Sequence, residues 1–311
     1  MAEVACLGEL FVDLTPHSLA NGKWLYAPCP GGAPGNVAVG MALLGHKSLM
    51  ISRVGDDAFG MLLLETLTDF GVDTVGVVLS SVEKTGLSVV TLNEAGDRSF
   101  MFYHDQPADL NINQDDITTE MLAGARILHV GVLPLSAPTS AAAQRKALDL
   151  ADAQSALISC DVNFRPNLWN DLKMMAAAGR EMISRAAIVK VSEAELQLLS
   201  GASDIEDAVH VLWHDKLILF SVTRGANGAT LYSRDGKHVC AGFSVRAVDT
   251  TGAGDAYTAS ILSGILSGVE PERLVNLACA AGALAATRKG AMQSLPTAEE
   301  VADMVLRKSK V

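Results

Sequence analysis

The sequence is short of basic residues and of cysteine, and both shortages exclude classes of protein. Its 311 residues hold 24 Lys and Arg against 35 Asp and Glu, a formal net charge of −11, and the basic residues form no run. A surface for nucleic acid or for an anionic membrane is therefore not expected, and we expect a small-molecule partner. The five cysteines are scattered without a C-x-x-C pair, which argues against a zinc site or disulfide framework and predicts reduced thiols in the cytoplasm.

Long hydrophobic runs and one common nucleotide motif are also missing. The most apolar late run, residues 274–286, is too short to span a bilayer. Glu3, Glu9 and Asp13 interrupt the apolar start, so no secretory signal is expected. No lysine-bearing Walker motif occurs, which excludes the P-loop class. With 49% hydrophobic and only 19% charged residues, the chain can bury a large core as a globular protein.

Short apolar runs alternate along the chain with segments of helical period. The runs that resemble buried strands are 4–7, 127–130, 156–160, 187–191 and 217–222. The helix-period segments between them are 139–153, 173–184 and 205–213. This alternation predicts an α/β fold with a mostly parallel sheet covered by helices on both faces.

Two stretches break the alternation. Residues 15–30 are loop-like or strand-like, and residues 85–103 alternate around the turn at 93–97, which predicts a hairpin. We interpret both as a small β-sheet lid on the α/β body. Because no linker or repeat is visible, we expect one domain over residues 1–311, with lid excursions around 13–30 and 85–105.

The most informative motif is DTTGAGD at residues 249–255, at the predicted start of a helix. Gly252 and Gly254 permit successive backbone N–H groups to point at one spot, where the helix dipole favours an anion. Asp255 beside that spot suits an enzyme that takes a proton from an attacking hydroxyl while the amides of residues 252–255, Ala253 included, hold the developing charge. The motif predicts phosphoryl transfer; taken alone, a glycine-rich helix cap is the alternative.

A second glycine-rich segment lies near the start of the chain. It reads GGAPGNVA at 31–38 and is followed by Leu44-Gly45 and by RVGDDAFG at 53–60. Together with the DTTGAGD motif, these segments resemble the two signatures of the ribokinase-like (PfkB-type) carbohydrate kinases, which include ribokinase, fructokinase, 2-keto-3-deoxygluconate kinase and adenosine kinase. The resemblance covers nearly the whole chain. It implies a ribokinase-like three-layer sandwich with a mostly parallel central sheet, and a sugar site between the body and a small β-sheet lid.

The resemblance also implies a set of sugar-binding residues. Asp13 follows the first strand, and its carboxylate can accept hydrogen bonds from both hydroxyls of a vicinal diol; a turn or helix-cap aspartate is the alternative. Gly31, Gly32 and Asn36 match the family's sugar-binding segment, where glycine permits close backbone approach and the amide offers donor and acceptor.

Further substrate contacts are expected from two later segments. Asn163 and Arg165 follow a strand, and a planar guanidinium there could contact the sugar or the transferred phosphoryl group, although a capping Asn and a surface Arg fit equally well. Tyr103 and Asp109, in the predicted lid segment and just after it, resemble the corresponding residues of bacterial fructokinases. His104 departs from the arginine often found there.

The nucleotide site is expected at three further segments. Ser192 and Glu195 resemble the family's Asn and Glu three apart that organise magnesium and phosphates, with Ser192 in place of Asn, and Glu195 could order the waters of a Mg²⁺ held by the nucleotide. Thr223, Gly225 and Gly228 match the family's nucleotide-phosphate loop. By resemblance the adenine would lie near Asn276; the alternative is a polar residue on a packed helix.

The segment RKGAMQS at 288–294 resembles one that holds a monovalent cation in many family members. Potassium is favoured because such a site is built mainly of neutral oxygens. The alternative is a plain loop that ends a helix at Gly290. The ligands implied by position are Asp249, Thr251, Ala285, Arg288, Gly290 and Ser294.

Together these features predict an ATP-dependent kinase that phosphorylates a primary hydroxyl of a ketohexose, with D-fructose giving fructose 6-phosphate. Asp255 acts as the base, the amides of 252–255 form the anion hole, and Mg²⁺ neutralises the remaining charge. A kinase for ketodeoxygluconate, aminoimidazole riboside or ribose remains an alternative, as does a catalytically silent sugar-binding regulator. A dehydrogenase is disfavoured because residues 8–13 lack the dinucleotide glycine pattern. A homodimer through the lid is a further expectation.

Overall fold

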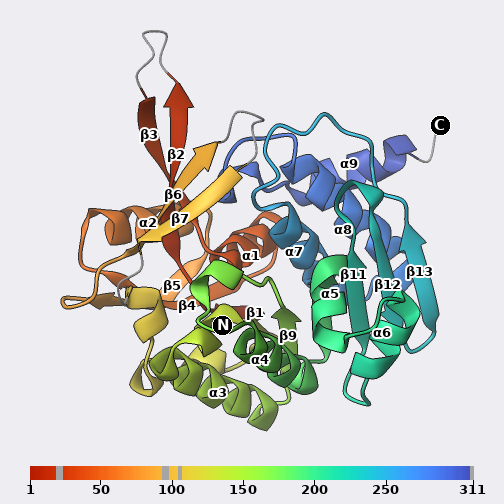
Figure 1. The fold of residues 1–311 in the computed structure, drawn as a ribbon, viewed down its shortest axis with the longest axis horizontal. Coiled ribbons are helices and arrows are strands. Elements are labelled where there is room, and N and C mark those ends of the chain that lie inside the picture. The colour runs from red at the N-terminus through yellow and green to blue at the C-terminus, as the bar shows by residue number, and fades with distance from the viewer. Residues whose placement is uncertain (19–23, 93–97, 104–106, 309–311) are drawn as a thin grey trace.

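The computed structural model describes residues 1–18, 24–92, 98–103 and 107–308 (Figure 1). A large sheet runs through its centre in the order β13-β12-β11-β10-β9-β8-β1-β4-β5. The strands from β11 to β5 are parallel to their neighbours, while β12 and β13 are antiparallel additions at one edge. The bounds are β1 Val4–Leu7, β4 Ser48–Gly55, β5 Asp73–Ser80, β8 Ile127–Val130, β9 Leu157–Asp161, β10 Ile188–Ser192, β11 Leu219–Thr223, β12 Ala229–Ser233 and β13 Gly236–Cys240.

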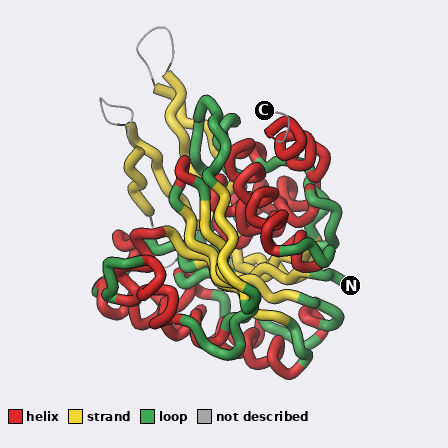
Figure 2. The backbone as a smooth tube through the Cα atoms, turned by 90° about the vertical axis from the view of Figure 1, so that its right-hand side faces the viewer, coloured by secondary structure: helices red, strands yellow, loops and turns green. Residues whose placement is uncertain are grey.

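Helices cover both faces of this sheet, which makes three layers (Figure 2). One face packs against α3 Pro138–Ala153, α4 Leu172–Arg185, α5 Glu193–Ser200 and α6 Ile205–Leu212. The other face packs against α1 Ala33–Leu43, α2 Ala58–Asp69, α7 Ala253–Leu266, α8 Pro271–Ala285 and α9 Ala298–Lys308. The predicted three-layer α/β sandwich with a mostly parallel central sheet is confirmed.

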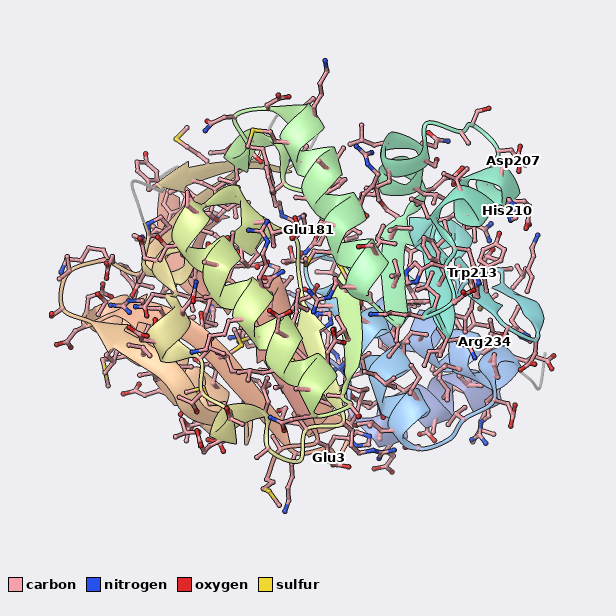
Figure 3. The ribbon with its side chains drawn as sticks, turned by 90° about the horizontal axis from the view of Figure 1, so that it is seen from below. Glu3, Glu181, Asp207, His210, Trp213 and Arg234 are labelled. Carbon is pink, nitrogen blue, oxygen red and sulfur yellow. The ribbon has the colours of Figure 1, made fainter. Side chains whose placement is uncertain are left out.

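The helix layer on the first face is seen directly from below in Figure 3, where Glu181 lies between α3 and α4. Its carboxylate accepts two hydrogen bonds from the Arg145 guanidinium, at 2.6 and 2.9 Å, and so joins the two helices. Both side chains are half exposed, so this pair contributes little stability compared with the apolar core beneath it. Within the described residues, no helix is long and apolar enough to cross a membrane.

A smaller sheet projects from the body at the top of Figure 1, in the order β3-β2-β6-β7. Its strands are β2 Phe11–Ser18, β3 Trp24–Gly31, β6 Gly86–Leu92 and β7 Arg98–Tyr103. β6 and β7 pair antiparallel, as the predicted hairpin requires, while the expected turn at 93–97 lies outside the described residues. The small β-sheet beside the α/β body is therefore confirmed. That residues 1–311 act as one domain stays a prediction.

Candidate active site

The centre of the site is the start of α7, where the chain turns at Gly252. This residue has a left-handed backbone (φ +79°), and no side chain caps the helix. A Cβ at Gly252 would lie 3.2 Å from the carbonyl oxygen of Ala291, so the turn fits closely against a neighbouring segment. The Ala253 amide donates to the Thr250 carbonyl (3.2 Å), and Asp255 is buried in the first helical turn. The uncapped, positive end of α7 therefore faces the same region as a buried carboxylate.

A second uncapped helix start lies beside the first. α1 begins after Gly32, whose φ is +107° and whose Cβ would lie 2.3 Å from the Glu9 carbonyl oxygen, so only glycine fits. Asn36, in the first turns of α1, donates through Nδ2 to Asp255 Oδ2 at 2.7 Å. α1 and α7 lie side by side in Figure 1, and the missing side chain at Gly40 allows their close contact at Ala259. The structure thus brings Gly32, Asn36 and Asp255 to one place.

The surroundings of Asp255 adjust its pKa. Burial and the nearby Asp161 raise the pKa, while the Asn36 hydrogen bond and the positive charges of Lys190 and Arg165 lower it, and the result is about 6. A carboxyl with this pKa is mostly deprotonated at neutral pH and still basic enough to accept a proton from a hydroxyl. The arrangement can therefore serve as a general base beside an anion-binding helix end.

Asp13 lies on β2, an interior strand of the small sheet, near the strand's N-terminal end. Asp13 is buried, and its Oδ1 accepts a hydrogen bond from the Ser88 hydroxyl. Its Oδ2 lies close to Gly31: a Cβ added to Gly31 would be 3.2 Å from this oxygen. Ser88 pairs with Asp13 on one side and with Phe102 on the other, so the three side chains share a face. Ser88 did not stand out in the sequence, because a serine in an alternating strand gives no signal of its own.

The structure does not bring Tyr103 to this face. Its neighbour Phe102 lies across from Ser88, and the ring of Phe102 meets that of Phe11 edge-on, with centroids 6.0 Å apart. Since successive side chains of a strand point to opposite faces, Tyr103 lies on the other face of the small sheet, where it is 63% exposed. A contact between Tyr103 and the sugar therefore stays a prediction, and in this structure Phe102 is the residue of β7 that shares the face of Asp13.

Asp109, in the short 3₁₀ helix Ala108–Asn111, forms a buried acidic pair with Glu9. Both carboxylate oxygens of Asp109 and Oε2 of Glu9 lack a hydrogen-bond partner among the described residues. Burial and the negative charge of Glu9 raise the pKa of Asp109 to about 8, while burial and the negative charge of Asp255 raise the pKa of Glu9 to about 7. A direct contact between Asp109 and substrate stays a prediction, because the carboxyl is fully covered in this structure.

Asn163 and Arg165 lie in the loop after β9. Asn163 has a positive φ of 41°, which is uncommon for a residue with a side chain, and the next residue donates its amide to Glu195 Oε1 at 2.7 Å. Arg165 is exposed, and its charge lowers the pKa of both Asp255 and Glu9. Arg165 therefore lies close enough to act on the centre electrostatically.

Ser192 and Glu195 form a capping box at the start of α5. Glu195 Oε2 accepts from the Ser192 amide and hydroxyl, and Oε1 holds the Phe164 amide. Both carboxylate oxygens therefore connect β10 to the loop after β9, a structural role that the sequence motif did not indicate. A water-mediated contact from Glu195 to Mg²⁺ remains a prediction.

The predicted nucleotide residues lie at the end of β11 and on α8. Thr223 donates to the Val191 carbonyl (3.3 Å), and Gly225 is exposed with a positive φ. Gly228 is buried, and a Cβ at this position would lie 2.0 Å from the Cys240 carbonyl oxygen. Packing therefore requires glycine there. Asn276 donates to the Glu272 carbonyl of its own helix at 2.8 Å. Contacts from these residues to a nucleotide stay predictions.

The residues predicted to hold a monovalent cation meet beside the α7 turn. Asp249 is buried and accepts from the amides of Thr251 (2.9 Å) and Gly290 (3.0 Å). Ser294 is fully buried and donates to the Ala291 carbonyl, against which Gly252 packs. At the end of α8, the Ala285 carbonyl accepts from the Arg288 amide, while the Arg288 guanidinium turns away to pair with Glu300. These residues fit a site of carbonyl and hydroxyl oxygens with one carboxylate.

Two charged residues at the centre were not selected from the sequence. Lys190 on β10 forms an ion pair with Asp161 at the end of β9, with Nζ 3.0 and 3.1 Å from the two carboxylate oxygens. Both side chains are almost completely buried. In the sequence, the only sign of this pair was a charged residue in a short apolar strand. The register of β9 and β10 is what places Lys190 and Asp161 side by side.

A separate cavity of about 640 Å³ lies between the chain after β13, α8 and α9. Its lining includes Phe243, Leu284, Met304 and Arg307. None of the residues predicted for substrate, nucleotide or cation lines this cavity. It is therefore distinct in its residues from the cluster around Asp255.

The fold and the site together define a class of protein, and comparison with known proteins gives the same class. The chain belongs to the pfkB family of carbohydrate kinases, whose family model matches residues 1–298. The prediction of a ribokinase-like carbohydrate kinase is thereby confirmed.

Individual relatives are named as fructokinases. The chain is 39% identical to the fructokinase of Escherichia coli, over 96% of this chain and 98% of that protein. It superposes with a TM-score of 0.91 on the ATP-bound crystal structure of fructokinase from Xylella fastidiosa, at 31% identity, covering 99% of this chain and 100% of that one. A double mutant of Vibrio cholerae O395 fructokinase with bound fructose, ADP and potassium ion gives a TM-score of 0.87 at 32% identity, covering 98% of each chain.

Proposed function

We propose that this chain is an ATP-dependent fructokinase, which converts D-fructose and ATP to fructose 6-phosphate and ADP. The observation that carries the proposal is the buried Asp255, held by Asn36 at the converging N-termini of two helices, with a pKa of about 6. This site offers a base and an anion-binding helix end side by side, which is what phosphoryl transfer to a hydroxyl requires.

In this proposal each group of residues has one task. Asp255 takes the proton from the attacking primary hydroxyl, and the backbone amides of residues 252–255 stabilise the charge on the transferred phosphoryl group. Asp13, oriented by Ser88, accepts hydrogen bonds from a pair of sugar hydroxyls. Asn36 keeps the Asp255 carboxylate directed at the reacting hydroxyl.

Mg²⁺ bound with the nucleotide neutralises phosphate charge in such reactions. Glu195 is the candidate to order its waters, next to the loop that carries Arg165. A potassium ion fits the segment around Asp249 and Ser294, because the groups there are carbonyl and hydroxyl oxygens with a single carboxylate.

The test is a coupled kinase assay with D-fructose, ribose, adenosine and ketodeoxygluconate, followed by identification of the product from a mixture. D-fructose is expected to have the highest kcat/KM, since a site built to bond one hydroxyl pattern can reject an analogue by roughly 10⁴. Preference for a riboside or ketodeoxygluconate would reassign the sugar and leave the kinase class intact.

We further infer a homodimer formed through the small sheet and a cytoplasmic location. The face of this sheet opposite Asp13 exposes Tyr26, Met101 and Tyr103, an apolar surface of the kind that pairs with a second copy. The five cysteines form no disulfide with one another in the described part of the chain, in keeping with a reducing compartment. Light scattering of the wild type and of Met101→Lys checks the dimer: a monomeric wild type would end that part of the proposal.

A further inference from the structure

The ion pair between Lys190 and Asp161 lies directly beneath the helix start that the proposed function uses. The two residues face each other in the register of β9 and β10, on the sheet face that packs against α7. Asp161 Oδ2 also accepts from the Thr258 hydroxyl of α7 at 3.1 Å. A Cβ at Gly254 would lie 3.2 Å from Lys190 Nζ, so the ammonium lies next to the second glycine of the turn.

A buried ion pair of this kind needs an explanation beyond stability. Taking two charges out of water carries a large desolvation cost, and apolar replacements of similar volume are often neutral or stabilising. Burial alone would lower the pKa of Lys190. The carboxylates of Asp161, Glu195 and Asp255 together have the larger, opposite effect, so the pKa is raised above its ordinary value and the side chain stays charged. A positive charge is therefore held next to the uncapped N-terminus of α7.

We propose that Lys190 is the cationic residue of the phosphoryl-transfer site: fixed by Asp161 against Gly254, its ammonium stabilises the charge of the transferred phosphoryl group together with the α7 amides. This inference rests on the proposed kinase function. Glycine at 254 leaves room for the ammonium beneath the turn, because a larger residue would press on Nζ. Asp161 acts as a positioning residue, since it restrains Nζ and is itself restrained by Thr258.

The first experiment compares Lys190→Met with the double variant Lys190→Met/Asp161→Asn. The single variant leaves a buried carboxylate unpaired, while the double variant is again neutral and is expected to fold with a Tm near that of the wild type. In both variants kcat is expected to fall by about 10², the scale for loss of one preorganised group that stabilises transition-state charge. If the double variant recovers the wild-type kcat, the pair is structural and the proposal is wrong.

The second experiment measures binding without turnover. Affinity is determined for ADP alone and for ADP with aluminium fluoride and Mg²⁺, which mimics the planar phosphoryl group. Lys190→Met/Asp161→Asn is expected to weaken the second complex by at least about 30-fold and the first by less than about threefold, because the charge matters most where the phosphoryl group is in transit. Equal weakening of the two complexes, or none, overturns the proposal.

A matched control is available on the opposite side of the sheet. Lys146 on α3 donates to the Gln114 carbonyl and lies outside the site, so Lys146→Met should alter neither affinity. The outcomes also separate this inference from the proposed function. If the wild type phosphorylates no sugar, the proposed function fails, whereas the binding measurements on ADP with aluminium fluoride still decide the role of Lys190.

Discussion

The two faces of the central sheet differ sharply although both are covered by helices. Toward α3 and α4, β10 and β11 present Val189, Val191, Phe220 and Val222, all buried in one apolar core. Toward α7, the alternate positions of the same strands and of β9 combine the apolar Ile188 and Leu219 with polar groups, since Ser221 is bonded to Tyr257 and Lys190 to Asp161. Both faces therefore contribute apolar core, but only the α7 face also places charge and hydrogen bonds beneath the uncapped end of α7.

The largest effect expected on the α7 face comes from Asp255→Asn. The substitution keeps the shape of the side chain but removes the base, so kcat is expected to fall by about 10²–10⁴. Nucleotide binding, measured by calorimetry, should persist because the turn at residues 252–254 is unchanged. A kcat within a few-fold of the wild type would mean that Asp255 is not the base.

On the α3 face, Phe220→Ala is expected to act on stability alone. Phe220 is fully buried, and truncation of a core aromatic costs about 3–5 kcal/mol in the free energy of unfolding. The neighbouring Ser221→Ala, on the α7 face, is the matched control: it removes one hydrogen bond to Tyr257 and should cost only about 1–3 kcal/mol. Urea denaturation gives both values. A larger loss for Ser221→Ala would contradict the division between the faces.

The pH dependence of kcat/KM should follow the charge state of Asp255. Its pKa of about 6 lies above the ordinary value, so the active, deprotonated form is lost as the pH falls through 6. The rate is expected to drop tenfold per pH unit below that point and to level off above it. The groups that act on this carboxyl are Asn36, Asp161, Lys190, Arg165 and Glu9. The Glu9→Gln variant should still lose kcat/KM as the pH falls below 6. If this loss disappears in the variant, Glu9 and not Asp255 is the group that titrates.

The smallest effect is expected from the monovalent cation beside α7. An ion held near Asp249 and Ser294 would fix the geometry of the turn without contacting the sugar. Activity in K⁺ should therefore exceed activity in Na⁺ or in a bulky organic cation at equal ionic strength. Equal rates in all three salts would remove this site from the proposal.

The sequence by itself determined the layers of the fold and the two helix starts. Alternating apolar runs and helix-period segments require a covered parallel sheet, and the glycines at 32 and 252 mark backbone conformations that other residues rarely adopt. The motifs around Asn36 and Asp255 could be recognised locally, and the structure joins these two residues although they are 219 positions apart.

Tertiary structure decided which side chains face each other across strands. Nothing in the sequence separated Tyr103 from its neighbours, but the pairing of β6 with β7 puts Phe102, one residue earlier, across from Ser88 and leaves Tyr103 on the other face. Lys190 and Asp161 were not found because each is a single charge in an apolar run, and only the register of β9 and β10 under α7 makes them a pair. Local sequence determines a residue's backbone conformation and the alternation of side chains along a strand. Strand register and helix packing, which join distant segments, decide which residues each side chain contacts.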